Sequence, residues 1–260
     1  MTRFEGSVAV ITGAGSGIGK ATAQQLASEG ASVILVGRTL AKLEDVASHI
    51  NEQYGEKSAV VFSADVTKEE EIEKLSQFVQ TNFGNLDVVV NNAGASSSSS
   101  ILDLELADWE AVQDVNLTSV FLVSKHLSKL LIQAATNDGA VKKDRAVVNV
   151  ASLSGYKAGA KIPHYSTAKA GVIHFSKALA AELASHGIRV NSVSPGFVET
   201  PLTEQGLANK SFVSAIERNT ALKRVGNPDE IAKVIAFAAS KDASYMTGSD
   251  LLVDGGWLIT

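Results

Sequence analysis

The 260-residue sequence contains no cysteine, which excludes disulfide bonds, cysteine-ligated metal ions and thiol nucleophiles. It also lacks a run of about 18 apolar residues, so no segment is expected to cross a membrane. The net charge is −5 and no dense stripe of lysine and arginine occurs, so nucleic acid is not an expected partner. The five histidines lack the spacing of metal ligands, and we predict no metal site. Without a signal-peptide pattern in its first residues, the chain is predicted to be soluble and cytoplasmic.

Apolar runs alternate with amphipathic stretches along the whole chain. The runs are continuous in apolar residues, which is typical of a parallel sheet covered by helices on both faces. We expect strands near residues 7–12, 31–36, 59–63, 86–90, 145–150, 188–193 and 250–253. We expect helices near residues 17–29, 40–54, 107–135 and 165–185, and further helices after Thr67 and Asn227. The pattern predicts one α/β domain over residues 1–260, a Rossmann-like doubly wound parallel sheet of about seven strands with helices on both faces.

Two helix starts carry capping signals, and two segments are irregular. Thr67, with Glu70 three residues later, predicts a capping box. Asn227, followed by a proline and two acids, predicts a second capped helix start. The five serines at 96–100 are interpreted as a loop. Residues 195–224 are long and mixed, and they either form a mobile lid or include a small helix that packs on the core.

A glycine-rich turn follows the first expected strand, in the segment Thr12-Gly13-Ala14-Gly15-Ser16-Gly17-Ile18-Gly19. Its first, third and fourth glycines permit a tight turn and let a pyrophosphate approach the backbone at a helix N-terminus. The spacing differs from the commoner G-x-G-x-x-G fingerprint. Alone, such a segment is more typical of a plain strand-to-helix turn. Its place after the first strand, together with the residues described next, favours a dinucleotide site.

Tyr165 and Lys169 are four residues apart on an expected helix, so they share one face. The pKa of a free tyrosine is about 10, and a neighbouring ammonium would lower the pKa of Tyr165 toward the working range of an acid–base catalyst. Ser152, upstream of this pair, can donate a hydrogen bond to a substrate carbonyl. By itself the pair is typical of a solvated helix face, and Ser152 of a strand end. With the nucleotide turn, these residues predict hydride transfer between a nicotinamide and a carbonyl group.

Eight segments together resemble a known family, and they cover the chain from end to end. They are Thr12–Gly19, Asp65-Val66, Asn91-Asn92-Ala93-Gly94, Asn116, Ser152, Tyr165-x-x-x-Lys169, Pro195-Gly196 and Thr247-Gly248 with Asp254-Gly255-Gly256. On these segments the chain resembles the short-chain dehydrogenase/reductase family. Within that family it is most similar to the group of 3-oxoacyl-carrier-protein reductases and secondary-alcohol dehydrogenases.

The resemblance implies a complete set of site residues. The implied catalytic residues are Asn116, Ser152, Tyr165 and Lys169. The implied cofactor-binding residues are Gly13, Ser16, Gly17, Ile18, Gly19, Arg38, Asp65, Val66, Asn92, Ala93, Gly94, Tyr165, Lys169, Pro195, Gly196, Val198 and Thr200. In the family, the residue matching Asn116 holds a water that relays protons to the lysine.

The end of the second strand predicts the cofactor. Nicotinamide enzymes that use NAD place an acid there to bind the ribose 2′-hydroxyl, whereas a nearby arginine accommodates a 2′-phosphate. By resemblance, Gly37 occupies the place of the acid and Arg38 follows it. A guanidinium can pair with a phosphate in a bidentate manner. We therefore predict NADP(H), although Ser16 stands where some family members carry a second basic residue.

The predicted function is NADP(H)-dependent interconversion of a ketone or aldehyde and an alcohol. One alternative is 3-oxoacyl-carrier-protein reduction specifically, for which Lys157, Lys161 and Lys210 would supply a basic patch. Another is a non-catalytic NADP-binding sensor or scaffold on the same fold. The expected substrate is a small carbonyl or alcohol, with an acyl thioester as one form of it, and the resemblance implies a homotetramer.

Overall fold

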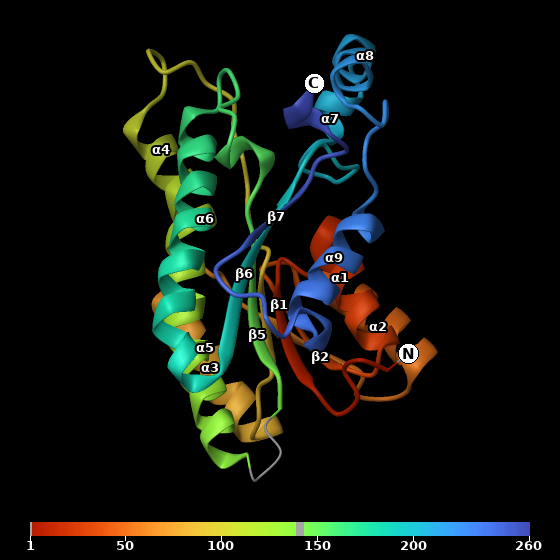
Figure 1. The fold of residues 1–260 in the computed structure, drawn as a ribbon, viewed down its shortest axis with the longest axis vertical. Helices are drawn as coiled ribbons and strands as arrows, with labels where there is room; N and C mark the ends of the chain where they lie inside the picture. The colour runs from red at the N-terminus through yellow and green to blue at the C-terminus, as the bar shows by residue number, and fades with distance from the viewer. Residues whose placement is uncertain (1, 139–142) are drawn as a thin grey trace.

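In the computed structural model, which describes residues 2–138 and 143–260, seven parallel strands form one sheet (Figure 1). The strands are β1 (Val8–Thr12), β2 (Ser32–Gly37), β3 (Ala59–Ser63), β4 (Val88–Asn91), β5 (Arg145–Val150), β6 (Ile188–Pro195) and β7 (Asp250–Val253). Their order across the sheet is β3-β2-β1-β4-β5-β6-β7, and every neighbouring pair is parallel. The predicted fold class is confirmed. The chain reverses its direction of winding between β1 and β4, which is where ligands bind in sheets of this kind.

Helices cover both faces of the sheet, and the two layers lie on opposite sides of the strands in Figure 1. One layer holds α1 (Gly17–Ser28), α2 (Leu40–Tyr54) and α9 (Pro228–Ala239), and the other holds α3 (Glu69–Phe83), α5 (Ser119–Asn137) and α6 (Pro163–Leu183). The short helices α4 (Leu106–Gln113), α7 (Glu204–Leu207) and α8 (Lys210–Asn219) lie toward one end of the molecule. Within the described ranges, no helix combines the length and the apolar character needed to span a bilayer.

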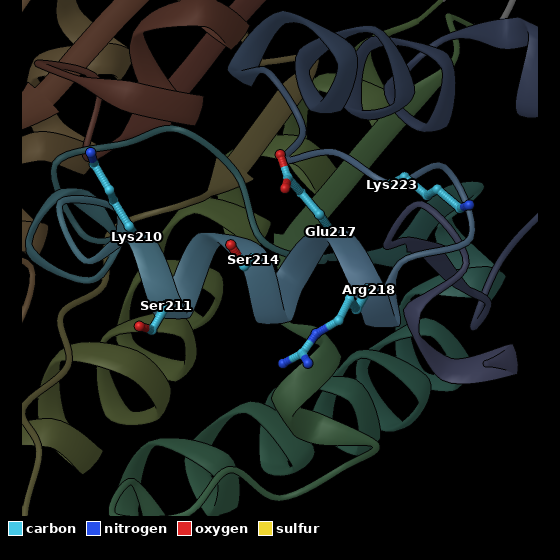
Figure 2. Close-up of a pocket in the computed structure, with 6 residues that line it drawn as sticks. All are labelled: Lys210, Ser211, Ser214, Glu217, Arg218 and Lys223. Carbon is cyan, nitrogen blue, oxygen red and sulfur yellow. The ribbon is translucent and has the colours of Figure 1, made fainter.

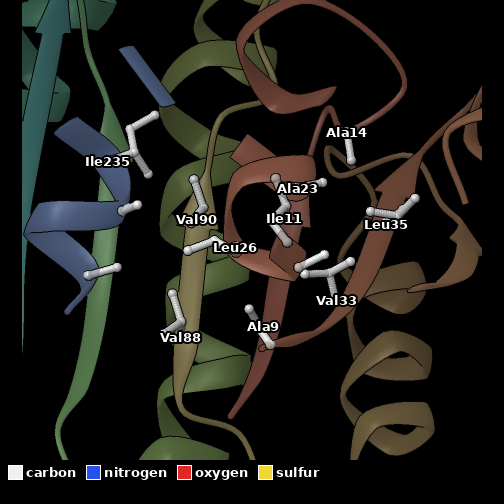
Figure 3. Packing of buried hydrophobic residues seen from close by; sticks show 14 of the residues in the cluster. Ala9, Ile11, Ala14, Ala23, Leu26, Val33, Leu35, Val88, Val90 and Ile235 are labelled. Carbon is white, nitrogen blue, oxygen red and sulfur yellow. The ribbon is translucent and has the colours of Figure 1, made fainter. Parts of the chain in front are cut away.

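The strands place successive side chains in two separate cores. In β1, Ala9 and Ile11 face the layer of α1, α2 and α9, whereas Val8 and Val10 face the other layer. Figure 3 shows the first core, where Leu26 of α1 packs among the strand residues. This alternation follows from the two-residue period of a strand. Each fully buried aliphatic side chain contributes about 1.5–3 kcal/mol to the stability of the fold, so both helix layers stabilise the sheet.

The predicted capping box at Thr67 is wrong. The helix α3 begins at Glu69, and Lys68 precedes it without a side-chain cap. The Thr67 hydroxyl instead donates to Asp65 at 2.8 Å, and Glu71 accepts the Asp65 backbone N–H at 2.7 Å. Short polar side chains compete for nearby backbone groups in several ways, and here the turn after β3 took precedence over the helix end.

The other capping prediction is confirmed. The side chain of Asn227 accepts the Asp229 N–H at 3.0 Å, and Glu230 accepts the Asn227 N–H at 2.8 Å. Pro228 occupies the first position of α9, where its missing N–H costs nothing. This cap anchors the chain directly after the segment expected to form a lid.

The helix expected over residues 107–135 is divided. A π-helical turn, Asp114–Thr118, separates α4 from α5. Such turns insert one extra residue into a helix and re-aim a side chain, and they occur mostly at functional sites. Residues 96–100 form a loop, as expected. Residues 195–224 include α7 and α8, and Ile216 of α8 is buried, so this segment contains a small helix that packs on the core.

Candidate active site

The glycine turn after β1 folds as it does because larger residues do not fit. Gly13 has φ +67°, and a β-carbon there would lie 2.8 Å from the Asn92 amide nitrogen. Gly17 has φ +53° and lies against Thr200, whose side chain would be 3.2 Å from an added β-carbon. A β-carbon on Gly19 would overlap the Gly13 carbonyl. The turn therefore brings the first strand, the fourth strand and the segment after β6 into contact.

The N-terminus of α1 is open to an anion. Ser16 precedes this helix, and its side chain makes no capping hydrogen bond. The first intrahelical bond runs from the Lys20 N–H to the Ser16 carbonyl, so the N–H groups of residues 17–19 have no partner within the helix. Free N–H groups and the helix dipole suit the pyrophosphate of a dinucleotide. The turn and helix start thus fit the cofactor that the sequence predicts.

Thr12 joins the ends of β1 and β4 on the two sides of the switch point. Its hydroxyl accepts the N–H groups of Asn92 at 2.9 Å and Ala93 at 3.0 Å. The Asn92 side chain donates back to the Thr12 carbonyl at 3.0 Å. Gly94 follows, and a β-carbon there would lie 2.8 Å from Asn116 Oδ1 and 3.6 Å from Lys169 Nζ. Segments from three parts of the sequence therefore converge at this strand end.

Asn116 lies in the π-helical turn between α4 and α5 and is fully buried. Its amide nitrogen donates to the carbonyls of Ala95 at 2.7 Å and Val112 at 2.9 Å. Its Oδ1 atom has no hydrogen-bond partner among the described residues. Buried polar atoms are almost always satisfied, so this exception beside Gly94 and Lys169 points to an oxygen that a ligand or a bound water can satisfy.

Lys169 is buried in α6 with few polar contacts. Its Nζ donates to the Val150 carbonyl at 2.9 Å and lies 5.7 Å from the centre of the Tyr165 ring. Burial lowers the pKa of Lys169 to about 8, because desolvation penalises the ammonium. Burial thus brings the pKa of this lysine closer to neutrality than that of an exposed lysine.

Tyr165 differs from the prediction in the direction of its pKa shift. Burial raises the pKa of Tyr165, and interaction with the Ser152 hydroxyl lowers it by less. Burial is therefore the dominant effect on the Tyr165 hydroxyl, and the Lys169 ammonium, which donates to the Val150 carbonyl, does not outweigh it. Tyr165 thus keeps its proton at neutral pH and is set up as a donor.

Ser152 lies where β5 leads into a short 3-10 turn, Leu153–Gly155. Its Oγ accepts the Ser154 N–H at 3.1 Å, which leaves its own proton free to be donated to another group. The four predicted catalytic residues come from the ends of β5, the π-helical turn and the first turns of α6. The fold places these elements side by side.

His164 and Ser97 belong to the surroundings of this site. His164 is fully buried beside the tyrosine, and its Nε2 lies 2.8 Å from the Ser97 hydroxyl. Gln113 donates to the His164 carbonyl at 2.8 Å. Nothing in the sequence links His164 to Ser97, which lies in the serine run and 67 residues away.

The adenosine side of the predicted site lies at the ends of β2 and β3. Arg38 follows β2 and is exposed, and Val66 is buried. The pKa of Asp65 is lowered: desolvation opposes the shift, but hydrogen bonds from Thr67 outweigh it, and the charges of Arg38 and Lys68 add to it. Asp65 is therefore ionised near neutral pH and its Oδ1 is already engaged by the Thr67 N–H at 3.0 Å.

The segment after β6 forms the side of the predicted cofactor site opposite the adenosine end. Pro195 ends β6, and a β-carbon on Gly196 would lie 2.7 Å from the Asp254 backbone. Val198 is buried and forms an isolated bridge to Gly226. With Thr200 on the glycine turn, all four predicted residues of this segment lie at the same edge of the sheet as the nucleotide turn.

An aromatic cluster holds α8 and the C-terminus together. Phe197 packs edge-on against Phe212 of α8, with ring centres 5.5 Å apart, and against Trp257 at 4.8 Å. Lys157, from the segment between β5 and α6, has its Nζ 5.9 Å from the Trp257 ring centre. These contacts bring the C-terminus, α8 and the segment after Ser152 together.

A hollow of about 910 Å³ lies along α8, and Figure 2 shows the side chains that line it. They are Lys210, Ser211, Ser214, Glu217, Arg218 and Lys223. All come from α8 and the turn after it, and none comes from a strand end. The hollow therefore lies apart from the convergent polar groups of the candidate site.

Comparison with known proteins decides the family. A family model described as enoyl-(acyl carrier protein) reductase matches residues 13–258. The chain is also 38% identical over 257 residues to the 3-oxoacyl-[acyl-carrier-protein] reductase of Thermotoga maritima, a match that covers 99% of this chain and 100% of the relative. The chain belongs to the short-chain dehydrogenase/reductase family. It is thus an oxidoreductase of carbonyl and alcohol groups with a nicotinamide cofactor.

Other relatives support the assignment to the short-chain dehydrogenase/reductase family. A 3-oxoacyl-[acyl-carrier-protein] reductase of Synechocystis is 38% identical over 261 residues, and the match covers 100% of both chains. The solved structure of levodione reductase has a TM-score of 0.90 at 32% identity and covers 97% of this chain. A short-chain type dehydrogenase/reductase from Mycobacterium marinum has a TM-score of 0.89 at 36% identity and covers 99% of this chain.

Proposed function

We propose that this enzyme is an NADP(H)-dependent reductase that converts a ketone or aldehyde into an alcohol and also runs in reverse. The observation that carries the proposal is the convergence of Ser152, Tyr165, Lys169 and Asn116 beside the switch point of the sheet. The bound cofactor would supply the hydride. The residues of this chain would hold the carbonyl, deliver a proton and keep water out.

Tyr165 is the proposed proton donor. Its raised pKa keeps the hydroxyl protonated at neutral pH, which suits delivery of a proton to the carbonyl oxygen as an alcohol forms. Ser152 would donate a hydrogen bond to the same oxygen and stabilise its developing negative charge. The proton that Tyr165 gives up would be replaced through Lys169, which would take it from a water held by the buried Asn116 Oδ1.

The cofactor would lie across the glycine turn. Residues 17–19 at the start of α1 would bind its pyrophosphate, and Gly94 would leave room beside Lys169. Asp65 and Val66 would hold the adenine. Pro195, Gly196, Val198 and Thr200 would hold the nicotinamide end, next to Gly13, Ser16, Asn92 and Ala93.

The preference for NADP(H) rests on Arg38. It is exposed at the end of β2, and Gly37 stands where an acid would repel a 2′-phosphate. An exposed guanidinium at this point can pair with a dianion. A kcat/KM with NADH that exceeds the kcat/KM with NADPH would overturn this part of the proposal.

The first experiment is NADPH oxidation, followed by its absorbance, with a panel of aliphatic, cyclic and aromatic ketones and aldehydes. Turnover with at least one class is expected. Tight NADPH binding without turnover on any of them would favour the alternative of a non-catalytic NADP-binding sensor or scaffold.

A 3-oxoacyl thioester is the more specific substrate, and the names of the Thermotoga and Synechocystis relatives favour it. Lys157 near the C-terminal aromatic cluster and Lys210 on α8 would provide positive charge for an acidic carrier protein. The panel should therefore include a 3-oxoacyl group on coenzyme A and on a carrier protein. A kcat/KM for these that is no higher than for simple ketones would remove this option.

We further propose one domain over residues 1–260, a cytoplasmic location and a homotetramer. Exposed apolar side chains support assembly: Leu102, Leu106 and Phe121 lie around α4 and α5, and Tyr245 and Ile259 lie toward the C-terminus. Light scattering tests the assembly, and a monomeric mass would contradict it.

A further inference from the structure

The glycine turn touches the first turn of α2. A β-carbon on Gly15 would lie 3.1 Å from Lys42 Cβ and 3.6 Å from a methyl of Leu43. Leu43 is buried, and the same side chain lies 3.5 Å from a β-carbon built on Gly37 at the end of β2. The buried Leu43 therefore fixes the position of the neighbouring Lys42 side chain. This side chain starts at the rim between the glycine turn and the end of β2.

Positive charge gathers at this rim, where Asp65 is close enough for the charge of Arg38 to lower its pKa but forms no ion pair with it. Arg38 and Lys42 are both exposed, and no carboxylate lies within 4 Å of either in the parts of the chain that the structure describes. Lys20 of α1 lies 3.8 Å from Asp45, a long and exposed pair. The first turn of α2 contains no acidic residue, and Thr39 before it makes no side-chain cap, so the positive end of the helix dipole is not neutralised by the chain itself.

A phosphate monoester carries a charge of about −1.5 to −2 at neutral pH, so one guanidinium does not neutralise it. The glycine turn supplies no second cation, since Ser16 is uncharged. We propose that Lys42 is the second cation: with Arg38 it binds the 2′-phosphate of NADP(H), and its stem reaches the site because Gly15 has no side chain. This inference rests on the proposed use of NADP(H), and it identifies Lys42 as a residue that determines cofactor specificity.

The test is direct binding of NADPH and of NADH to the purified protein, measured by isothermal titration calorimetry without substrate. For Lys42→Ala we expect the Kd for NADPH to rise about 10-fold or more, as for loss of a charge-assisted hydrogen bond, with the Kd for NADH changed less than about 2-fold. Lys42→Arg should keep the preference for NADPH. Lys74→Ala, which removes an exposed lysine from α3 on the opposite face of the sheet, is the charge-matched control and should change neither Kd.

A second variant tests the same idea by gain of binding. In the Lys42→Ala background, Ser16→Arg places a cation in the glycine turn and should recover most of the lost NADPH affinity. A thermal scan of each variant checks that it is folded, which is expected because Lys42 is exposed.

The outcomes separate this inference from the function on which it rests. A wild-type protein that prefers NADPH, with a Lys42→Ala protein that keeps the full preference, would overturn the role of Lys42 and leave the proposed cofactor intact. Equal weakening of NADPH and NADH would also overturn it, since that indicates a structural role. A wild-type protein that binds NADH at least as tightly as NADPH would overturn the proposed cofactor and this inference together.

Discussion

Charged side chains are buried at both the amino and the carboxyl ends of the strands, but they differ in how many ion-pair and hydrogen-bond partners they have. At the amino end, Arg145 begins β5 and is 2% exposed. Its guanidinium contacts Asp138 through two nitrogens at 2.5 and 3.0 Å, donates to the Leu86 carbonyl at 3.3 Å and lies 3.5 Å from Asp87. Arg189 at the start of β6 is held in the same way by Asp144.

At the carboxyl end the buried polar groups have few partners. Lys169 makes one hydrogen bond, to the Val150 carbonyl, and no ion pair within residues 2–138 and 143–260. Oδ1 of Asn116 and Nδ1 of His164 have no partner in these same ranges. The pKa of Lys169 is shifted to about 8 by burial alone, whereas the pKa of Asp138 is held at about 2, chiefly by its hydrogen bonds with Arg145.

This difference separates charges that support the fold from charges that are available to a ligand. The guanidinium of Arg145 is held by a carboxylate and a carbonyl, although Asp87 Oδ1 beside it makes no hydrogen bond among the described residues, and breaking such a buried ion pair destabilises the protein. A buried polar group without hydrogen-bond partners lowers stability, and such groups are tolerated where they bind a ligand or take part in catalysis. The comparison can be tested at both ends.

The largest effect is expected at the carboxyl end, on activity. Tyr165→Phe removes the proposed proton donor and should lower kcat for carbonyl reduction by about 10³-fold, within the range for loss of a general acid. The melting temperature should change little, because among the described residues the hydroxyl interacts only with the Ser152 side chain. A variant with normal turnover would remove Tyr165 from the mechanism.

A similarly large effect is expected at the amino end, on stability. Arg145→Leu leaves the buried Asp87 and the partly buried Asp138 without their countercharge and should lower the free energy of unfolding by about 3–5 kcal/mol. Urea unfolding measures it, with Arg218→Leu on exposed α8 as the control that should change little. A loss below about 1 kcal/mol would show that the ion pairs of Arg145 do not support the fold.

A smaller effect is expected from Lys169→Met, on the pH dependence of the free energy of unfolding. Burial lowers the folded-state pKa of Lys169 from 10.5 to about 8, so the unfolded chain binds more protons between these values and wild-type stability rises with pH across them. Methionine removes this dependence. The difference in unfolding free energy between variant and wild type should therefore move by about 3 kcal/mol in favour of the wild type between pH 7.5 and about pH 10.5. Parallel stability curves would contradict it.

The smallest effect is expected for an exposed pair. Arg224 and Glu230 contact each other at 2.6 Å where the segment with α8 rejoins α9, and both are substantially exposed. Solvent screening leaves such pairs with little net contribution. Arg224→Gln should therefore leave the melting temperature unchanged within the error of a thermal scan. A shift as large as that of Arg145→Leu would show that burial is not what separates strong pairs from weak ones.

Local signals in the sequence were reliable where one residue type fits one local geometry. The tight turn between β1 and α1, the Asn227 cap and the continuous apolar strands are confirmed. The capping box predicted at Thr67 was wrong because the Thr67 hydroxyl hydrogen-bonds to Asp65 and does not cap the helix. The π-helical turn at Asn116 was not predicted, because the pattern of residues 107–135 indicates one continuous helix.

The sequence by itself determined the order of the elements, the family and the residue types present at the strand ends, because periodicity and turn chemistry act over a few residues. Only the tertiary structure decided which of those residues meet and which of their atoms remain unsatisfied. The pKa of Tyr165 illustrates this: spacing predicted a lowered value, but burial raises it and Lys169 is directed to Val150. Desolvation and hydrogen-bond partners depend on chain segments far apart in the sequence, so they are set only when the sheet and its two layers of helices assemble.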